Sequence, residues 1–154
     1  MSDWTIYNLN DINNSLNEIL TNGNGDYKEV PPGKYEVKIE KLELKATKDG
    51  RPMGFCQMRI QTGEYAKQCL FYNQVLVGTD KKTGKTTALG LHNFNKFVFT
   101  LSSRIPVKFK DFEQYGYMLL DVSEDIEKQH LSYEVEYSKK GEFSNYRITD
   151  IFED

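Results

Sequence analysis

The sequence has few of the residues on which most catalytic and metal sites depend. It contains two cysteines and two histidines in 154 residues, and they form no Cys or His pairs with metal-ligand spacing. Two cysteines are also too few for the disulfide framework of a small secreted protein. Acidic residues are numerous, but no spacing singles out a pair for general acid–base catalysis. We therefore expect no metal site, no cofactor and no enzymatic activity.

Long apolar segments are also missing. No run approaches the roughly 18 apolar residues that a membrane-spanning helix needs. The first ten residues lack the charged start and apolar core of a signal peptide. Charged residues make up 28% of the chain, which is typical of a soluble protein. We expect a cytoplasmic location and no membrane partner.

The net charge of −3 conceals an uneven distribution along the chain. Residues 31–110 carry fifteen Lys or Arg against six acids, a net charge of +9. Residues 1–30 carry −4 and residues 111–154 carry −8. A basic central segment between acidic ends points to a polyanionic partner, although chance or solubility would also explain it.

Apolar periodicity divides the chain into an N-terminal segment and a larger domain. Residues 12, 16, 19 and 20 form an apolar helical face, and the Gly- and Asn-rich residues 21–26 end that helix. We expect residues 1–26 to be a helix and linker, whose apolar face is suited to homo-oligomer formation. Residues 27–154 then form one domain.

Within that domain, period-two alternation predicts five strands, at residues 34–44, 53–62, 67–77, 131–137 and 143–152. A one-residue phase slip after Ile39 indicates a β-bulge in the first strand. Period-3.6 patterns predict helices over 88–103 and 112–126, with a strand over 117–120 as the alternative to part of the second. The fold is thus predicted as mainly β, a five-stranded antiparallel OB-fold-like barrel with a helical insertion between strands three and four. An α+β sandwich with the helices on one face is the alternative.

Aromatic residues make up 13% of the chain, and many stand beside Lys or Arg. At least half of them belong in the core, but proteins that bind single strands combine stacking aromatic rings with a basic groove. Phe55 is the clearest stacking candidate, because alternation places it opposite Cys56 and Met58 and beside Arg59. The candidate DNA-binding residues are Phe55, Arg59, Tyr65, Lys67, Tyr72, Lys81, Lys82, Lys85, Lys139, Lys140 and Arg147.

Two further features have more than one interpretation. The segment from Gly78 to Thr86 resembles a phosphate-binding P-loop, but five residues instead of four separate its glycines. We interpret it as an exposed lysine loop suited to phosphate contacts. Cys56 and Cys69 are predicted cross-strand neighbours, either a redox pair, half of a metal site or, as we favour, two reduced thiols.

Several segments resemble the small single-stranded DNA-binding proteins of tailed-phage replication and recombination modules. They are residues 30–45, 48–53, 63–65, 71–75, 137–143 and 146–148. The resemblance extends from about Gly25 to Ile151. It implies an OB-type fold, no enzymatic activity, and coating of single-stranded DNA in the host cytoplasm, with phage replication or recombination proteins as possible partners. The alternative is a non-catalytic barrel that binds a host or phage protein.

Overall fold

The structure is a computed structural model that describes residues 29–141 and 143–153. The chain divides into two compact units, Met1–Pro31 and Pro32–Asp154, and all elements described below belong to the second. The predicted N-terminal helix lies outside the described residues.

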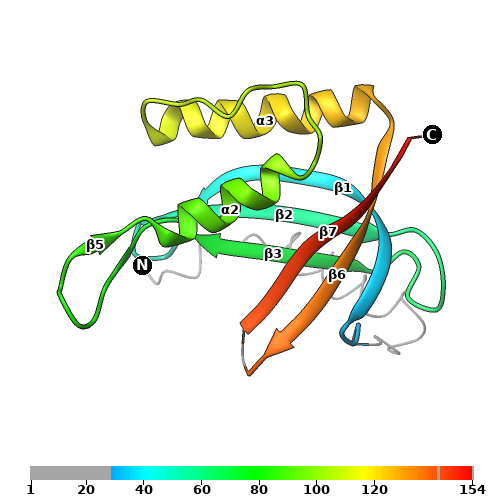
Figure 1. The fold of residues 1–154 in the computed structure, drawn as a ribbon, viewed down its shortest axis with the longest axis horizontal. Helices are drawn as coiled ribbons and strands as arrows, with labels where there is room; N and C mark the ends of the chain where they lie inside the picture. The colour runs from blue at the N-terminus through cyan, green and yellow to red at the C-terminus, as the bar shows by residue number, and fades with distance from the viewer. Residues whose placement is uncertain (1–28, 142, 154) are drawn as a thin grey trace, which may run out of the picture. The chain divides into compact units, whose positions relative to one another are not determined.

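Five strands form one antiparallel sheet in the order β3-β2-β1-β6-β7 (Figure 1). Their bounds are Gly33–Ala46 for β1, Pro52–Ile60 for β2, Cys69–Val75 for β3, Leu131–Lys140 for β6 and Phe143–Glu153 for β7. Two short strands, β4 (Gly78–Thr79) and β5 (Thr86–Thr87), pair as a separate hairpin. The prediction of a mainly β fold with five antiparallel strands is confirmed.

The predicted bulge bends β1 across the sheet. The pairing of β1 with β2 shifts register between Ile39 and Lys41, where the alternation in the sequence slips. Val37 and Leu42, on either side of the slip, are both buried. Residues 33–37 of β1 pair with β6, whereas residues 37–46 pair with β2. One curved strand therefore joins the two halves of the sheet (Figure 1).

The closed barrel predicted from the sequence is wrong, because β3 and β7 are the outer strands of the sheet and do not pair. Side chains bridge the opening instead. The rings of Tyr72 on β3 and Tyr146 on β7 lie 5.3 Å apart between centroids. The seam between these two strands is therefore bridged by side chains and not by backbone hydrogen bonds.

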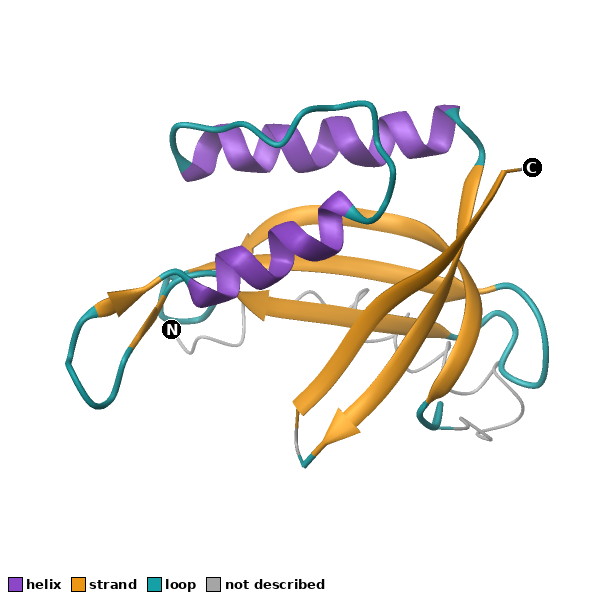
Figure 2. Cartoon of the chain, viewed as in Figure 1, coloured by secondary structure: helices purple, strands orange, loops and turns teal. Residues whose placement is uncertain are grey.

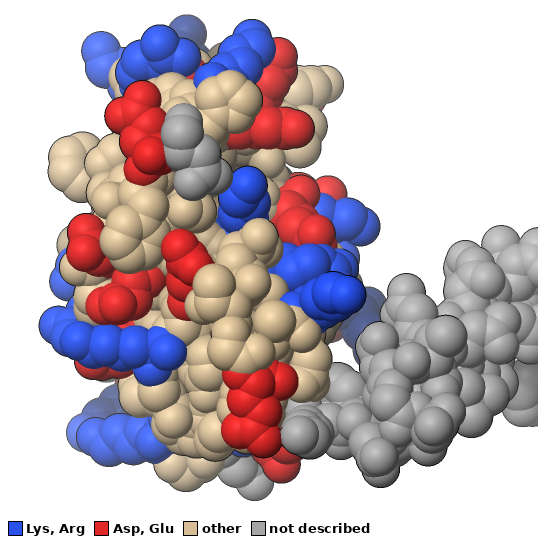
Figure 3. All heavy atoms as spheres, turned by 90° about the vertical axis from the view of Figure 1, so that its right-hand side faces the viewer, with Lys and Arg blue, Asp and Glu red and all other residues tan. Residues whose placement is uncertain are grey.

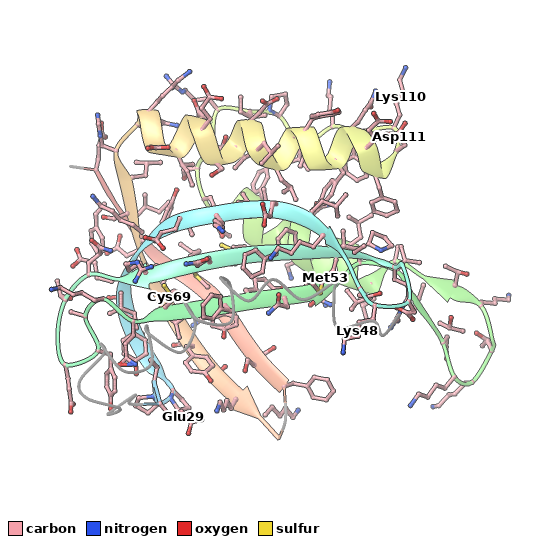
Figure 4. All side chains as sticks on the ribbon, turned by 180° about the vertical axis from the view of Figure 1, so that it is seen from behind. Glu29, Lys48, Met53, Cys69, Lys110 and Asp111 are labelled. Carbon is pink, nitrogen blue, oxygen red and sulfur yellow. The ribbon has the colours of Figure 1, made fainter. Side chains whose placement is uncertain are left out.

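Two helices, α2 (Leu89–Phe99) and α3 (Phe112–Lys128), pack on the same side of strands β1 to β3 (Figure 2). Helix α3 follows the predicted helical period and buries Tyr115, Leu119 and Val122. Figure 4 shows Asp111 at its start, and the Asp111 side chain accepts a hydrogen bond from the backbone N–H of Gln114 at 2.8 Å. The alternative strand over residues 117–120 is therefore excluded.

Two glycines allow α2 to lie close against the sheet. A Cβ atom at Gly90 would lie 1.9 Å from the carbonyl oxygen of Val75 on β3. A Cβ atom at Gly54 on β2 would lie 2.7 Å from the ring of Phe94. The backbone N–H of Leu91 also donates to the carbonyl of Leu76 at 3.0 Å. The absence of side chains at positions 54 and 90 thus fixes the distance between α2 and the sheet.

The connection between the helices is attached to α3 by an ion pair. Arg104 donates from Nη2 and Nε to Asp125 Oδ1, at 2.7 and 3.0 Å, and its backbone N–H donates to Oδ2 at 2.8 Å. The Arg104 side chain and backbone N–H lower the pKa of the buried Asp125 carboxyl to about 2. The carboxylate therefore stays charged and holds the connection in place.

Candidate nucleic-acid interface

The open seam between β3 and β7 forms a groove in two parts, which we call the seam cleft. Its inner lobe, with a volume of about 450 Å³, lies between the two edge strands and α2. Its outer lobe, of about 550 Å³, runs along β3 and the start of β7. Both lobes are lined by Tyr72, Gln74, Ser144, Asn145 and Tyr146. The shared lining shows that the two lobes adjoin at the seam.

Aromatic rings form much of the cleft wall. The Tyr72 ring lies 5.0 Å from Phe97 of α2, and Tyr146 stacks on Tyr137 at 5.1 Å with an interplanar angle of 10°. In the outer lobe, Phe71 is 48% exposed and Phe143 is 77% exposed. These two rings present more exposed area to a planar ligand than the rings of the inner lobe do.

Two cations line the inner lobe of the cleft, and one of them is paired with an acid on the neighbouring strand. Lys96 and Arg147 line the inner lobe, and neither lobe has an Asp or Glu among its described lining residues. Arg147 Nη2 lies 3.0 Å from Glu136 Oε1 on the neighbouring strand, an exposed pair that positions the guanidinium. Lys139 and Lys140 are exposed at the end of β6, and Lys140 pairs with Phe143 across the hairpin. The described lining of the cleft therefore carries the cations Lys96 and Arg147, of which Arg147 is paired with Glu136.

Burial keeps the tyrosines of the cleft neutral. It raises the pKa of Tyr72 to about 12, and burial together with the nearby Tyr137 raises that of Tyr146 to about 12. Both hydroxyls remain protonated near neutral pH and add no negative charge to the groove.

Two other hollows of the domain have a different electrostatic character. One beside the β1 bulge combines Lys38, Lys41 and Arg59 with Glu40 and Glu127. Another beside α3 is lined by Glu43 and Glu113 without a cation. On the face seen in Figure 3, Lys and Arg side chains alternate with Asp and Glu and form no single basic patch. The seam cleft differs from these two hollows in combining cations with aromatic rings and no acid, a combination that it shares with a smaller hollow lined by Phe99 and Arg104.

The structure brings only part of the predicted DNA-binding set together. Tyr72 and Arg147 line the inner lobe, and Lys139 and Lys140 lie at the hairpin that leads into β7. The remaining predicted residues lie on β2, on the β2–β3 connection or in the β4–β5 loop: Phe55, Arg59, Tyr65, Lys67, Lys81, Lys82 and Lys85.

The expected exposure of Phe55 is wrong. Alternation places it on the face opposite Cys56 and Met58, but its ring is only 7% exposed. Lys45 Nζ lies 3.8 Å from its ring centroid, and Phe71 stacks on it at 6.3 Å with an interplanar angle of 23°. Neighbours on β1 and β3 therefore occupy the surface that a base would need.

Arg59, Tyr65 and Lys67 take part in local contacts. Arg59 donates from Nε to Glu40 at 2.7 Å and from Nη1 to the carbonyl of Lys67 at 2.6 Å, and its hydrogen bond lowers the pKa of Glu40. The Tyr65 ring packs edge-on against Tyr35 at 6.1 Å. Their contribution to DNA binding remains a prediction.

The lysine loop is exposed, as predicted, and projects from the sheet between β4 and β5 (Figure 1). Asp80 Oδ1 accepts a hydrogen bond from the backbone N–H of Lys82 at 2.8 Å, and strands β4 and β5 close the loop as a hairpin. The surrounding strands are antiparallel, so the geometry is not that of a P-loop.

The two cysteines lie on opposite faces of the sheet. Cys56 pairs with Tyr72, whereas Cys69 pairs with Arg59, three residues further along β2. Figure 4 shows Cys69 on β3. Both thiols are free, and burial raises the pKa of each. The expectation that they are cross-strand neighbours is wrong, and a redox pair between them is excluded by this geometry. Among the described residues, no group of three or more His, Cys, Asp or Glu is arranged to hold a metal ion.

Sequence reasoning missed the lysine and the amides of the inner lobe. Asn93, Lys96 and Thr100 recur at spacings of three and four, which places them in one polar stripe beside Phe97 on α2. That spacing is visible in the sequence. The proximity of β7 to α2 is not, because it depends on contacts between distant segments.

A comparison with curated proteins found no match. In the described parts of the chain, no helix is long and apolar enough to cross a membrane. Residues 18–147 match the family described as "Protein of unknown function (DUF669)". Because this match covers most of the 154 residues, the chain belongs to the DUF669 family.

Proposed function

We propose that this protein binds single-stranded DNA with little sequence preference, as a non-catalytic component of phage DNA replication or recombination. The observation that supports this proposal most strongly is the seam cleft. It combines exposed aromatic rings with cations, and its described lining contains no acid.

Single strands differ from duplexes in presenting unstacked bases together with a charged backbone. Proteins that bind them without sequence preference offer aromatic rings to the bases and a basic groove to the phosphates. In the seam cleft, Phe71 and Phe143 provide the exposed rings. Lys96 and Arg147 provide cations for the phosphates, with Lys139 at the hairpin end. A strand lying along the groove meets both kinds of contact.

The connectivity of the sheet also supports this function. Three strands joined as hairpins, two helices and a final hairpin follow the order of an OB fold, with the last strand pairing left open. OB folds are frequent binders of oligonucleotides. The resemblance of residues 25–151 to phage single-stranded DNA-binding proteins supports the same role in the host cytoplasm.

The number of phosphate contacts sets the expected salt dependence. If Lys96, Arg147, Lys139 and Lys140 each neutralise one phosphate, log affinity falls with log salt at a slope of about −3. Each stacked base adds about 1–3 kcal/mol. Binding therefore persists across sequences and weakens steeply as salt increases.

The proposal is tested by fluorescence anisotropy of the full chain with labelled oligo-dT and a mixed-sequence oligonucleotide, from low to high salt. The double variant Lys96→Ala/Arg147→Ala is expected to reduce the magnitude of the salt slope by about 1.4 and to weaken binding to both sequences. The matched control is Lys48→Ala/Lys108→Ala, which removes two exposed lysines that do not line the cleft.

Absence of binding at low salt would contradict the proposal, and a protein-binding module would then be the better explanation. Equal losses in the cleft variant and the control variant would show that binding is general charge attraction and not a property of the cleft.

A further inference from the structure

The inner lobe of the seam cleft has the size and lining of a pocket for one small planar group. Its volume of about 450 Å³ lies within the range of about 300–1,000 Å³ that is usual for small-molecule sites. Phe97 of α2, Tyr72 of β3 and Tyr146 of β7 line it, and the Tyr72 ring lies 5.0 Å from Phe97 and 5.3 Å from Tyr146. The outer lobe, by contrast, presents the exposed rings of Phe71 and Phe143.

The polar groups of the inner lobe divide into fixed and free ones. Gln74 is fixed, because its Nε2 donates to the carbonyl of Val75 at 3.0 Å and its Oε1 accepts from the hydroxyl of Tyr72 at 3.4 Å. Asn93 on α2 and Asn145 on β7 are exposed, and neither side chain forms a hydrogen bond to another described residue. Two amides on opposite walls are thus free to bind a ligand.

We infer that the inner lobe holds a single base turned out of the bound strand, and that Asn93 and Asn145 read its hydrogen-bonding edge. This inference rests on the proposed function. An amide presents one acceptor and two donors, which matches the mixed donor and acceptor edge of a base. Lys96 and Arg147 lie on the same lobe to bind the phosphate attached to that base.

The chemistry of the lobe favours a nucleotide over other occupants. A purely apolar ligand would make no use of Lys96 or of the two amides. A free anion would use the cations but not the aromatic walls. A nucleotide has a flat apolar ring, a polar edge and a phosphate, and the lobe has a counterpart for each.

The pocket walls are held in place before a ligand arrives. Gly90 lets α2 approach the edge of β3, and the backbone N–H of Leu91 donates to Leu76 at 3.0 Å. Phe94 and Phe97 pack against Tyr72 at 5.4 and 5.0 Å. These contacts fix α2 against β3, and the contact of Tyr72 with Tyr146 at 5.3 Å joins β7 to the same cluster. In the inferred complex, one nucleotide in each bound stretch is therefore recognised by hydrogen bonds, while its neighbours are held by stacking alone.

Mononucleotides test this inference directly. The ¹⁵N-labelled full chain is titrated with dAMP, dCMP, dGMP and dTMP in turn, and with inorganic phosphate as the reference for anion binding alone. The side-chain amide signals of Asn93 and Asn145 are expected to shift with nucleotides but not with phosphate. The best of the four nucleotides is expected to compete with labelled oligo-dT about tenfold more strongly than the worst.

Substitutions of asparagines in the two lobes show which amides discriminate among the four nucleotides. Asn93→Ala/Asn145→Ala is expected to abolish the roughly tenfold difference among the four nucleotides and to leave the salt slope of oligo-dT binding unchanged. Asn73→Ala removes an exposed amide from the outer lobe and is expected to preserve the difference.

The outcomes separate this inference from the proposed function. If oligo-dT binds but the four nucleotides are indistinguishable, or phosphate shifts the amide signals equally, the base pocket is refuted and strand binding stands. If oligo-dT does not bind at low salt, both proposals fail.

Discussion

At the scale of single residues, substitutions of two phenylalanines are expected to have separate effects, one on DNA binding and the other on the free energy of unfolding. Phe143 is 77% exposed in the outer lobe, whereas Phe55 is 7% exposed beneath Lys45. We expect Phe143→Ala to weaken oligo-dT binding roughly five- to 150-fold through the loss of one stacked base, with no change in thermal unfolding. Anisotropy and a thermal melt of the same preparation measure both quantities.

Phe55→Ala is the matched comparison. Removal of a buried ring is expected to lower the free energy of unfolding by about 3–5 kcal/mol, and the affinity of the protein that remains folded is expected to be unchanged. If the Phe55 variant were instead stable and had lost DNA binding, the DNA-binding surface would have to lie on the outer face of β2.

The ion pair of Arg104 and Asp125 gives a second prediction at this scale. The pKa of Asp125 is about 2 in the folded protein, below its ordinary value of 3.8. The unfolded chain therefore takes up this proton first, so the contribution of Asp125 is present above about pH 4 and disappears as the pH falls towards 2. We expect Asp125→Asn to lower the free energy of unfolding by about 1.5–3 kcal/mol at pH 7.

Urea unfolding at pH 7 and pH 3 measures this effect, and the difference between the Asn variant and the native protein is expected to be smaller at pH 3. Glu124→Gln provides the control, because the pair of Glu124 with Lys128 is exposed and is expected to contribute less than about 1 kcal/mol. If both substitutions lowered the free energy of unfolding equally, the Asp125 contacts would contribute no more than an exposed ion pair does.

At the scale of elements, the position of α2 depends on a missing side chain. A methyl group at Gly90 would lie 1.9 Å from the carbonyl oxygen of Val75 and must displace the helix. Ala is otherwise favoured over Gly in helices by about 1 kcal/mol. We nevertheless expect Gly90→Ala to destabilise the fold and to weaken nucleotide binding in the inner lobe, as measured by urea unfolding and by competition.

Gly116 in α3 is the control for this prediction. A Cβ atom there would lie 3.5 Å from the Leu44 side chain, an ordinary contact. Gly116→Ala is therefore expected to stabilise the protein by about 0.5–1 kcal/mol. A stable Gly90 variant with an unchanged inner lobe would contradict the role assigned to the close approach.

The positions of strands and helices were predictable from the sequence where the pattern of apolar residues within the element itself determines them. The phase slip after Ile39 marks the bulge in β1, and the helical spacing over 112–126 marks α3 despite Gly116. The two-residue strands β4 and β5 were not predictable, because they are too short to show alternation. The exposure of Phe55 was not predictable either, since it depends on side chains from two neighbouring strands.

At the scale of the whole domain, the basic centre and the acidic C-terminal segment of the sequence meet in space. Lys34 lies 3.9 Å from Glu134, and Arg104 lies 2.7 Å from Asp125. Such pairs cross the boundary between the +9 and −8 segments and offset part of the charge separation. A sum along the chain shows which segment is basic, but only the fold shows that the seam cleft keeps cations without acids on its described lining.

The buried tyrosines predict a loss of stability at alkaline pH. Burial raises the pKa of Tyr72, Tyr146, Tyr115 and Tyr133 above their ordinary value of 10, to about 12 for the first two. The folded state holds these protons more tightly than the unfolded chain does. Stability is therefore fully present below about pH 10 and falls as the pH rises towards 12.

Urea midpoints at pH 7, 9, 10 and 11, recorded together with tyrosinate absorbance, measure this dependence. We expect a plateau up to about pH 9 and a decline above about pH 10. Titration of all tyrosines near pH 10 in the folded protein would contradict it.

The unpaired edges of β3 and β7 have a consequence for how a strand enters. A closed channel must be threaded from an end, whereas a groove on the surface, such as the seam cleft between these edges, accepts a polymer laterally at any point along its length. If the protein binds single strands as proposed, we expect it to capture a circular strand, which has no end, as readily as a linear one, and to release it sideways when an advancing polymerase or a pairing strand reaches it.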